Sequence, residues 1–379
     1  MTSLGRTTTL LRMLAILALL GLLAAACGEE SSDGGEETPA TESPSSPSET
    51  AADEETATEQ TEVATGEETD SGPLSVYSGR NEDLVGPLLE QFTTETGIEV
   101  EVRYGDTAEL AATILEEGQN SPADVFFGQD AGALGALRDQ GVLSPLPADQ
   151  LDLVEDRFKA ADGTWVGVSG RSRVIAYNTA ELSEEDVPDS VLDLAGDEWS
   201  GRVGWAPTNG SFQAFVTAMR VELGDEATAQ WLEDMIANDV QVYDGNTAIV
   251  EAVSRGEIDL GLVNHYYLYR YLAEDPDFPV ANAFLPGGDV GSLVNVAGAG
   301  ILQTTDQTEA AEQFVAFLLS DTAQEYFRDE TVEYPLVTGI EADDRLPALE
   351  SIQTPDLDLS DIADLQGTLE LLRTTGALL

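Results

Sequence analysis

The feature that most constrains the fold is a regular alternation of short apolar runs with amphipathic segments, which begins at residue 73. LSVYSG (74–79), IEVEVRY (98–104) and ADVFFG (123–128) have the length and residue types of strands. Between them, EDLVGPLLEQFTTETG (82–97) and TAELAATILEEG (107–118) repeat apolar residues at helical spacing. The order predicts an α/β protein with largely parallel sheets. Further strand-like runs lie at 164–170, 173–178, 201–206, 240–245 and 258–263, and further helical segments at 211–224 and 247–256.

The first 27 residues resemble a targeting segment. Two arginines precede an apolar stretch, which is short for a membrane span and ends in AAAC. A cysteine directly after small residues resembles the lipidation site of a bacterial lipoprotein, with Cys27 becoming the first residue of the mature chain. The alternative is an ordinary secretory signal with an incidental cysteine. Cys27 is the only cysteine, so a lipidated mature protein would have neither a disulfide nor a catalytic thiol.

Residues 28–72 contain 15 acidic residues, no basic residue and almost nothing apolar. Such a segment cannot bury enough surface to offset its ordering entropy, so we expect a disordered acidic tether. The formal net charge of the whole chain is −56, of which −43 falls on residues 73–379. This acidity argues against nucleic acid as a partner.

Polar loops follow several of the expected strands. SGRNED comes after the first strand, GQDAG after the third, and PTNGS after GRVGWA. In α/β sheets, ligands bind outside the carboxyl ends of strands, and loops rich in amides, hydroxyls and glycine can hold an anion. Each loop alone is also what an ordinary connection looks like.

The segment NHYYLYRY (264–271) contains four tyrosines and the only histidine of the chain. It directly follows the apolar run IDLGLV. Phenolate is a hard anionic oxygen donor, so an adjacent pair of tyrosines is a candidate pair of ligands for a hard metal ion. The alternative is a helix that packs its tyrosines on one face. We expect Tyr269 and Tyr271 to be packing residues and His265 not to be a ligand.

Six segments in order resemble the ferric-ion-binding solute receptors of bacterial ABC importers. They are VYSGRNED (76–83), SPADVFF (121–127), SGRSRVIAYNT (169–179), PTNGSF (207–212), EIDLGLVNHYY (257–267) and EYPLV (333–337). The resemblance implies a two-lobed periplasmic-binding-protein-like fold (type II) with a cleft between lobes joined by crossing strands. It implies lobes of about 73–171 with 298–333 and of about 172–297 with 334–379, joined at 170–177, 293–300 and 333–337.

The resemblance also implies the function and the partners. The chain would be a monomeric extracytoplasmic receptor and not an enzyme. It would capture Fe(III) with carbonate, phosphate or citrate and deliver it to the permease and ATPase subunits of an importer. Acylation at Cys27 would anchor it to the lipid bilayer.

By resemblance, Tyr266 and Tyr267 coordinate the iron. Where the family has a His and a Glu as further ligands, this chain has Asn81 and Gln129, which are neutral amides. The carboxylates of Glu82 and Asp130 could substitute, or exogenous anions could fill the coordination sphere. The implied anion site consists of Asn209, Gly210, Ser211, Asn246, Asn264 and Arg171.

Two other functions stay open at this level. The same fold could bind a different solute, such as an oxyanion, a polyamine or an iron chelate. A secreted enzyme has little support, because there is one histidine and no GxSxG motif, although carboxylate-only glycosidase chemistry needs neither.

The cysteine predicts membrane anchoring. The chain expressed in its host should partition with membranes, and Cys27→Ser should release it because the thiol that accepts the lipid is gone. Fractionation followed by mass spectrometry of the N-terminus measures both. A mature wild-type N-terminus without lipid would contradict the prediction.

Overall fold

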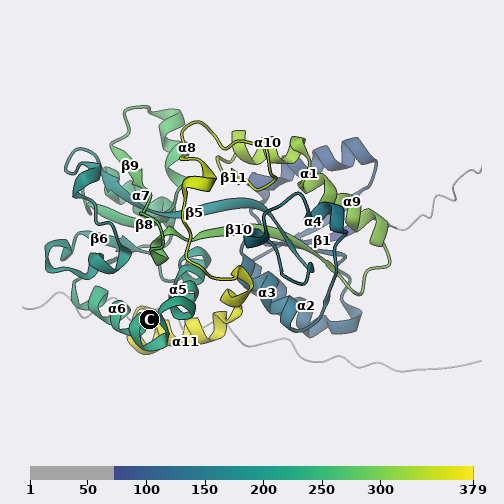
Figure 1. The fold of residues 1–379 in the computed structure, drawn as a ribbon, viewed down its shortest axis with the longest axis horizontal. Helices are drawn as coiled ribbons and strands as arrows, with labels where there is room; N and C mark the ends of the chain where they lie inside the picture. Colours follow the sequence, from purple (N-terminus) through teal and green to yellow (C-terminus); the bar gives the residue numbers. More distant parts are fainter. Residues whose placement is uncertain (1–71, 379) are drawn as a thin grey trace, which may run out of the picture. The chain divides into compact units, whose positions relative to one another are not determined.

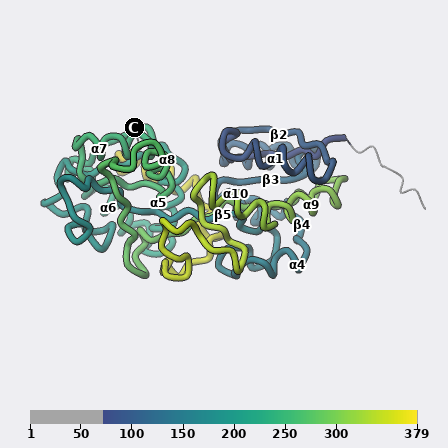
Figure 2. The backbone as a smooth tube through the Cα atoms, turned by 90° about the horizontal axis from the view of Figure 1, so that it is seen from above, coloured from purple at the N-terminus to yellow at the C-terminus, as the bar shows by residue number. Residues whose placement is uncertain are grey.

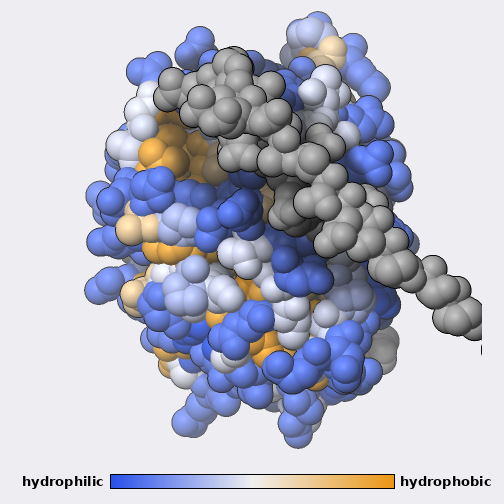
Figure 3. All heavy atoms as spheres, turned by 90° about the vertical axis from the view of Figure 1, so that its right-hand side faces the viewer, coloured by the Kyte–Doolittle hydropathy of each residue, from blue (hydrophilic) through white to orange (hydrophobic). Residues whose placement is uncertain are grey.

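The computed structural model describes residues 72–378. The expected leader, Cys27 and nearly all of the tether lie outside these residues. Within them, no helix is long and apolar enough to cross a membrane. On the face drawn in Figure 3, hydrophilic side chains cover most of the surface that is not grey, with smaller hydrophobic areas between them.

Three parallel strands begin the described chain. β1 (Leu74–Ser78) lies between β2 (Val100–Tyr104) and β3 (Val125–Gly128) and pairs in parallel with both. The connections are α1 (Glu82–Thr96) and α2 (Thr107–Glu117). Because the strands run in parallel, the loops that follow β1 and β3 meet at one edge of the sheet.

A single long strand joins the two halves of the sheet. β5 (Val166–Asn178) is buried along its whole length. Its first half pairs antiparallel with β10 (Val294–Leu302) up to Ser172, and its second half pairs with β8 (Leu260–Asn264) from Arg173 onward. The sequence predicted two strands here, because the polar residues at 169–173 interrupt the apolar pattern.

The sheet is mixed, which corrects the expectation of largely parallel sheets. β6 (Val203–Trp205) is parallel to β7 (Gln241–Val242) and β8, but β9 (Val280–Ala283) is antiparallel to β5. β10 is also antiparallel to β3. The remaining strands are β4 (Leu143–Ser144) and β11 (Tyr334–Pro335).

Helices cover the two halves of the sheet separately. Figures 1 and 2 both draw α1, α9 and α10 with the strands of the first half, and α5, α6 and α7 with those of the second. The bounds are α3 (Ala131–Asp139), α4 (Ala148–Leu151), α5 (Gly210–Leu223), α6 (Asp225–Ala237), α7 (Asn246–Ser254), α8 (Tyr267–Glu274), α9 (Thr308–Leu318), α10 (Asp321–Asp329) and α11 (Leu365–Thr375).

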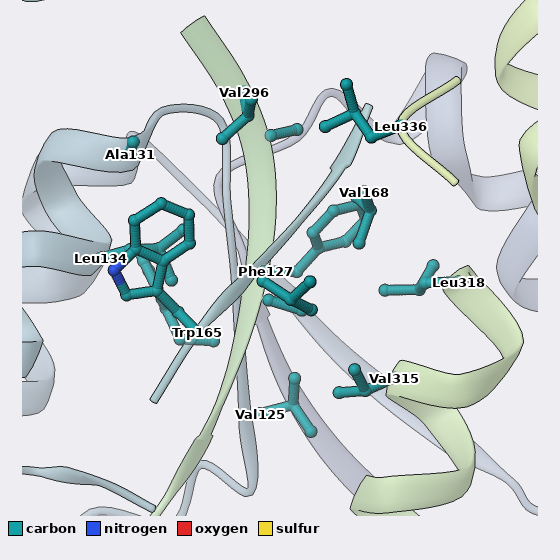
Figure 4. Packing of buried hydrophobic residues seen from close by; sticks show 14 of the residues in the cluster. Val125, Phe127, Ala131, Leu134, Trp165, Val168, Val296, Val315, Leu318 and Leu336 are labelled. Atoms are coloured by element: carbon teal, nitrogen blue, oxygen red, sulfur yellow. The ribbon is translucent and has the colours of Figure 1, made fainter. Parts of the chain in front are cut away.

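Each half has its own hydrophobic core. In the first, Phe127 of β3 and Trp165 lie among aliphatic side chains from β10 and α9 (Figure 4). In the second, Trp205, Phe212 and Trp231 pack edge to face. Two cores joined by β5 form two lobes, a first lobe around β1–β3 and a second around β6 and β8.

The C-terminal segment differs from the expectation that residues 334–379 belong to the second lobe. Tyr334, Leu336 and Ile362 are buried in the core of the first lobe, whereas Leu372 of α11 and Ala377 after it are buried in the core of the second. The segment therefore extends along both lobes. Its apolar residues are spaced irregularly, so the sequence does not show which core they join.

Gly135 on α3 permits close contact between that helix and the 3₁₀ turn at Leu359–Ala363. A Cβ at Gly135 would lie 2.6 Å from the carbonyl oxygen of Ser360. A Cβ at Gly245, which is extended with a φ of 178° directly before α7, would meet no atom within 4 Å beyond its chain neighbours.

Gly135→Ala should therefore lower the free energy of unfolding, by about 1–3 kcal/mol, because backbone must move. Gly245→Ala, the control, should change it by less than about 1 kcal/mol, because the added methyl group meets no packed atom and extended backbone accepts alanine. Urea denaturation of both variants measures the difference. Equal stabilisation by both substitutions would contradict the close packing seen here.

Candidate metal centre

A cavity of about 840 Å³ lies between the two lobes. From the first lobe it is lined by the loops after β1 and β3 and by faces of α2 and α3. From the second lobe it is lined by the start of α5, by Tyr267 and by α11. Of the residues expected at the site, it brings together Asn81, Glu82, Gln129, Asp130, Asn209, Gly210, Ser211 and Tyr267.

Tyr266 and Tyr267 stack on each other at the end of β8. Their ring centroids are 4.5 Å apart and the rings are inclined by 25°. Tyr267 faces the cavity as the first residue of α8, and Tyr266 is buried behind it. Burial, helped by the neighbouring Tyr267, raises the pKa of the Tyr266 phenol well above its ordinary value. The proton therefore stays on this phenol unless a cation displaces it.

Two of the candidate ligands in the first lobe also cap helices. Asn81 accepts a hydrogen bond from the backbone N–H of Asp83 at the start of α1. Asp130 accepts one from Ala133 at the start of α3. Burial raises the pKa of Asp130, although this hydrogen bond and the charge of Arg171 oppose the shift. One side-chain oxygen of Asn81 and one of Asp130 are thus already used in helix capping, whether or not a metal is bound.

Four of the six expected anion residues, Asn209, Ser211, Asn246 and Asn264, form one hydrogen-bonded network at the start of α5. Asn264 donates to the Ser211 hydroxyl at 3.0 Å, and Asn246 donates to Asn209 at 3.3 Å. Asn246 in turn accepts from the backbone N–H of Asn264. The network fixes Asn209, Gly210 and Ser211 at a helix N-terminus, where backbone dipoles favour an anion.

Buried arginines lie beneath the tyrosines. Arg171 donates to the backbone carbonyl of Gln129, and its Nη1 is 4.0 Å from Glu333. Arg173 donates to Asn264 at 3.1 Å, and its Nη2 has no hydrogen-bond partner among residues 72–378. Burial lowers the pKa of Arg173 to about 10, which leaves it charged at neutral pH.

Arg80 makes a two-pronged ion pair with Glu333, with N–O distances of 3.0 and 2.7 Å. Ser169 and Thr331 also donate to this carboxylate. Burial works against its charge, but the two arginines and these donors outweigh burial and lower the pKa of Glu333. The pair connects the loop after β1 to the segment that leads into β11.

His265 links three segments that we call the hinge region: the middle of β5, the end of β8 and the residues before β11. Its Nδ1 accepts the backbone N–H of Ser172 on β5 at 3.1 Å, and its Nε2 lies 2.8 Å from the carbonyl oxygen of Val332. Nε2 must therefore carry the proton and donate it. Val332 has a φ of 53°, which is strained for a β-branched residue, and this hydrogen bond helps to hold it.

Residues 120–361 match the family described as bacterial extracellular solute-binding protein. The chain is 34% identical over 309 residues to the major ferric iron-binding protein of Neisseria meningitidis serogroup B, covering 80% of this chain and 92% of that one. The chain belongs to this solute-binding family. The family resemblance seen in the sequence is thereby confirmed.

Solved structures agree on the fold. Iron-bound HitA from Pseudomonas aeruginosa is 34% identical with a TM-score of 0.76, covering 80% of this chain and 99% of HitA. The Trichodesmium protein IdiA (FutA), solved in complex with iron and citrate ligands, is 29% identical with a TM-score of 0.71, covering 80% and 99%. The two-lobed α/β fold of this solute-binding family member is thus confirmed.

Four expected site residues lie behind the cavity wall, and each touches or adjoins a residue that lines it. Tyr266 stacks on Tyr267, Asn264 and Asn246 bond to the loop before α5, and Arg171 bonds to Gln129. The sequence missed Arg80, Arg173 and Glu333. The only signal for Arg173 was that SGRSR (169–173) places two arginines in an otherwise apolar strand, and neither Arg80 nor Glu333 had a signal of this kind.

The environment of His265 predicts a pH-dependent stability. Burial lowers its pKa to about 4, although Glu333 and its hydrogen bonds oppose the shift. The unfolded chain, with a histidine pKa near ~6.5, therefore binds the proton first as the pH falls. The stabilisation is complete above that value and is lost as the pH falls towards the folded pKa, by about 2 kcal/mol between ~6.5 and ~5.

Urea denaturation at several pH values checks this prediction. His265→Asn should be less stable at neutral pH but should show a flatter pH dependence in that window. No other histidine is present to mask the difference. The same slope in wild type and variant would show that His265 does not titrate between the folded and unfolded states.

Proposed function

We propose that this solute-binding protein is an extracytoplasmic receptor for ferric iron that delivers its cargo to an ABC importer. The observation that carries the proposal is the stacked pair Tyr266–Tyr267 at the cavity, beside a helix N-terminus suited to an anion. The relatives described above, which are named for ferric iron or solved with it, support this substrate.

The chemistry of the pair favours a trivalent ion. A buried phenol with a raised pKa gives up its proton only to a strongly charged cation. Fe(III) meets this requirement, and phenolate oxygen is a donor that it prefers over amides. Divalent metals prefer imidazole, thiolate or carboxylate.

The iron ligands from the chain would be Tyr266 and Tyr267, with one carboxylate from Glu82 or Asp130. Asn81 and Gln129 line the cavity opposite, but neutral amides contribute little to Fe(III). Glu82 is exposed at the first turn of α1 and free to turn inward. Asp130 would have to share its carboxylate with its helix cap.

An exogenous anion would complete the coordination sphere. Asn209, Gly210 and Ser211 would hold it at the start of α5, supported by Asn246 and Asn264. The charged side chain of Arg171 lies near Tyr266 and favours the ionised form of that phenol. Carbonate, phosphate and citrate all fit this chemistry, and the iron and citrate of the Trichodesmium structure favour citrate.

Closure of the lobes would couple binding to transport. The two lobes contribute different residues to one cavity, so a bound ion favours the arrangement in which both reach it. We propose that the permease and ATPase subunits of an importer recognise this closed form. The receptor would act as a monomer, held at the membrane by acylated Cys27, and would catalyse no reaction.

The tyrosine pair predicts a colour. The iron-free protein given ferric citrate should turn orange to red by tyrosinate-to-iron charge transfer. Tyr267→Phe should reduce the intensity of this absorption band and weaken iron binding by at least about tenfold, because one of the two anionic ligands is lost while the ring stays. Visible absorption and calorimetry measure the two effects.

Tyr271→Phe is the matched control. Tyr271 is on the same helix, but its hydroxyl donates to Glu251 and is not part of the pair. This variant should keep the colour. A colourless wild type that binds an iron-free solute tightly would overturn the proposal.

A further inference from the structure

The cavity extends away from the tyrosines as an apolar arm. One face of α2 contributes Ala108, Ala111, Ala112 and Leu115 to its wall. Ala133 and Ala136 of α3 and Leu365 and Leu369 of α11 also line the cavity. The side chain of Leu115 is 37% exposed there. We name these eight residues the apolar arm.

The apolar arm exceeds what a single ion needs. A cavity of about 840 Å³ falls within the range of roughly 300–1,000 Å³ that holds small organic ligands. One iron ion with carbonate would occupy a small part of it. Apolar surface that lies exposed in a cavity gains free energy when an apolar group covers it.

An iron ion held by the tyrosine pair needs further donor atoms. Two phenolates fill only part of an octahedral sphere, and Asn81 and Gln129 offer amides. A chelator that stays on the iron would supply the missing oxygens and carry its own substituents into the adjoining arm.

The charges of the cavity select among chelators. The charged residues that line the cavity are four acidic ones, Glu82, Asp83, Asp106 and Asp130, and two arginines, Arg80 and Arg373. Because Arg80 is paired with Glu333, the acidic residues predominate. Strongly anionic complexes, such as ferric catecholates, would be repelled there. Each hydroxamate carries one negative charge per donor pair, so Fe(III) complexes with one or two hydroxamates are cationic and leave coordination positions free for the tyrosines.

We infer that the receptor takes up ferric hydroxamate complexes with apolar substituents, the iron held by the tyrosine pair and the substituents by the apolar arm. This inference rests on the proposed ferric function and adds the class of chelate. The competing explanation is that the apolar arm only provides the surfaces that pack against each other when the two lobes close. In that case a substituent on the chelator would gain nothing.

Two probes with identical donors test the inference. Full-length protein is titrated by calorimetry with iron(III) acetohydroxamate and iron(III) benzohydroxamate, which differ only in methyl against phenyl. The phenyl complex should bind about tenfold tighter, because the ring buries apolar surface in the arm. Equal affinities, or no binding of either complex, would overturn the inference.

Substitutions in the apolar arm locate the effect. Leu115→Asn and Ala112→Asn change exposed positions of α2 and should reduce the preference for phenyl to about threefold or less. Leu153→Asn is the matched control, since Leu153 is 40% exposed and lies outside the cavity lining. An unchanged preference in both arm variants would also overturn the inference.

Ferric citrate separates this inference from the proposed function. If it gives the Tyr267-dependent colour while the two hydroxamates bind equally, the ferric function stands and the chelate class is wrong. If wild type binds neither ferric citrate nor a ferric hydroxamate, the ferric function itself fails.

Discussion

Three almost fully buried arginines set the electrostatics of the site on which the two lobes converge. Glu333 pairs closely with Arg80 and lies 4.0 Å from Arg171, while Arg173 bonds only to a neutral amide. A buried guanidinium without a carboxylate is costly, and burial indeed lowers the pKa of both Arg171 and Arg173. Negative charge brought to Tyr266, Tyr267 or the start of α5 would relieve that cost. The interior is therefore prepared for anions within a chain that is strongly acidic overall.

The same groups connect the site to the hinge. Glu333 follows Val332, whose carbonyl accepts from His265, and His265 directly precedes the tyrosine pair. Through Arg80, Glu333 also reaches the loop after β1 that presents Asn81 to the cavity. A shift of β11 relative to β5 would thus disturb both sides of the site at once. Each of these polar groups is buried, so a movement that breaks one hydrogen bond must supply a new partner. This requirement favours discrete open and closed arrangements over gradual bending.

The sequence was sufficient to predict features that depend on residues close together in the chain. Gly97 ends α1 in the left-handed conformation, as its position after an apolar helical repeat predicted. The tyrosine pair and the loop at Asn209 were visible as motifs. The features that the sequence did not predict depend on contacts between residues far apart in the chain. Nothing near Arg80 in sequence reveals Glu333, which is 253 positions away. The continuity of β5 was hidden because its polar residues interrupt the apolar pattern, while two of the strands that pair with it, β10 and β11, come from a distant part of the chain.

The chain's departure from the familiar ligand set then has a structural consequence. In the first lobe, Asn81 and Asp130 cap the helices that carry them, so the loops keep their shape without a bound ion. The anionic donors of the second lobe, by contrast, are phenols whose protons must be displaced. In the proposed site, metal capture would depend mainly on the two phenols of the second lobe and on what accompanies the iron, while the first lobe would add one carboxylate, from Glu82 or Asp130. A receptor built this way gains selectivity from the shape and charge of the whole complex, since the ion alone meets too few charged ligands from the protein to be held on its own.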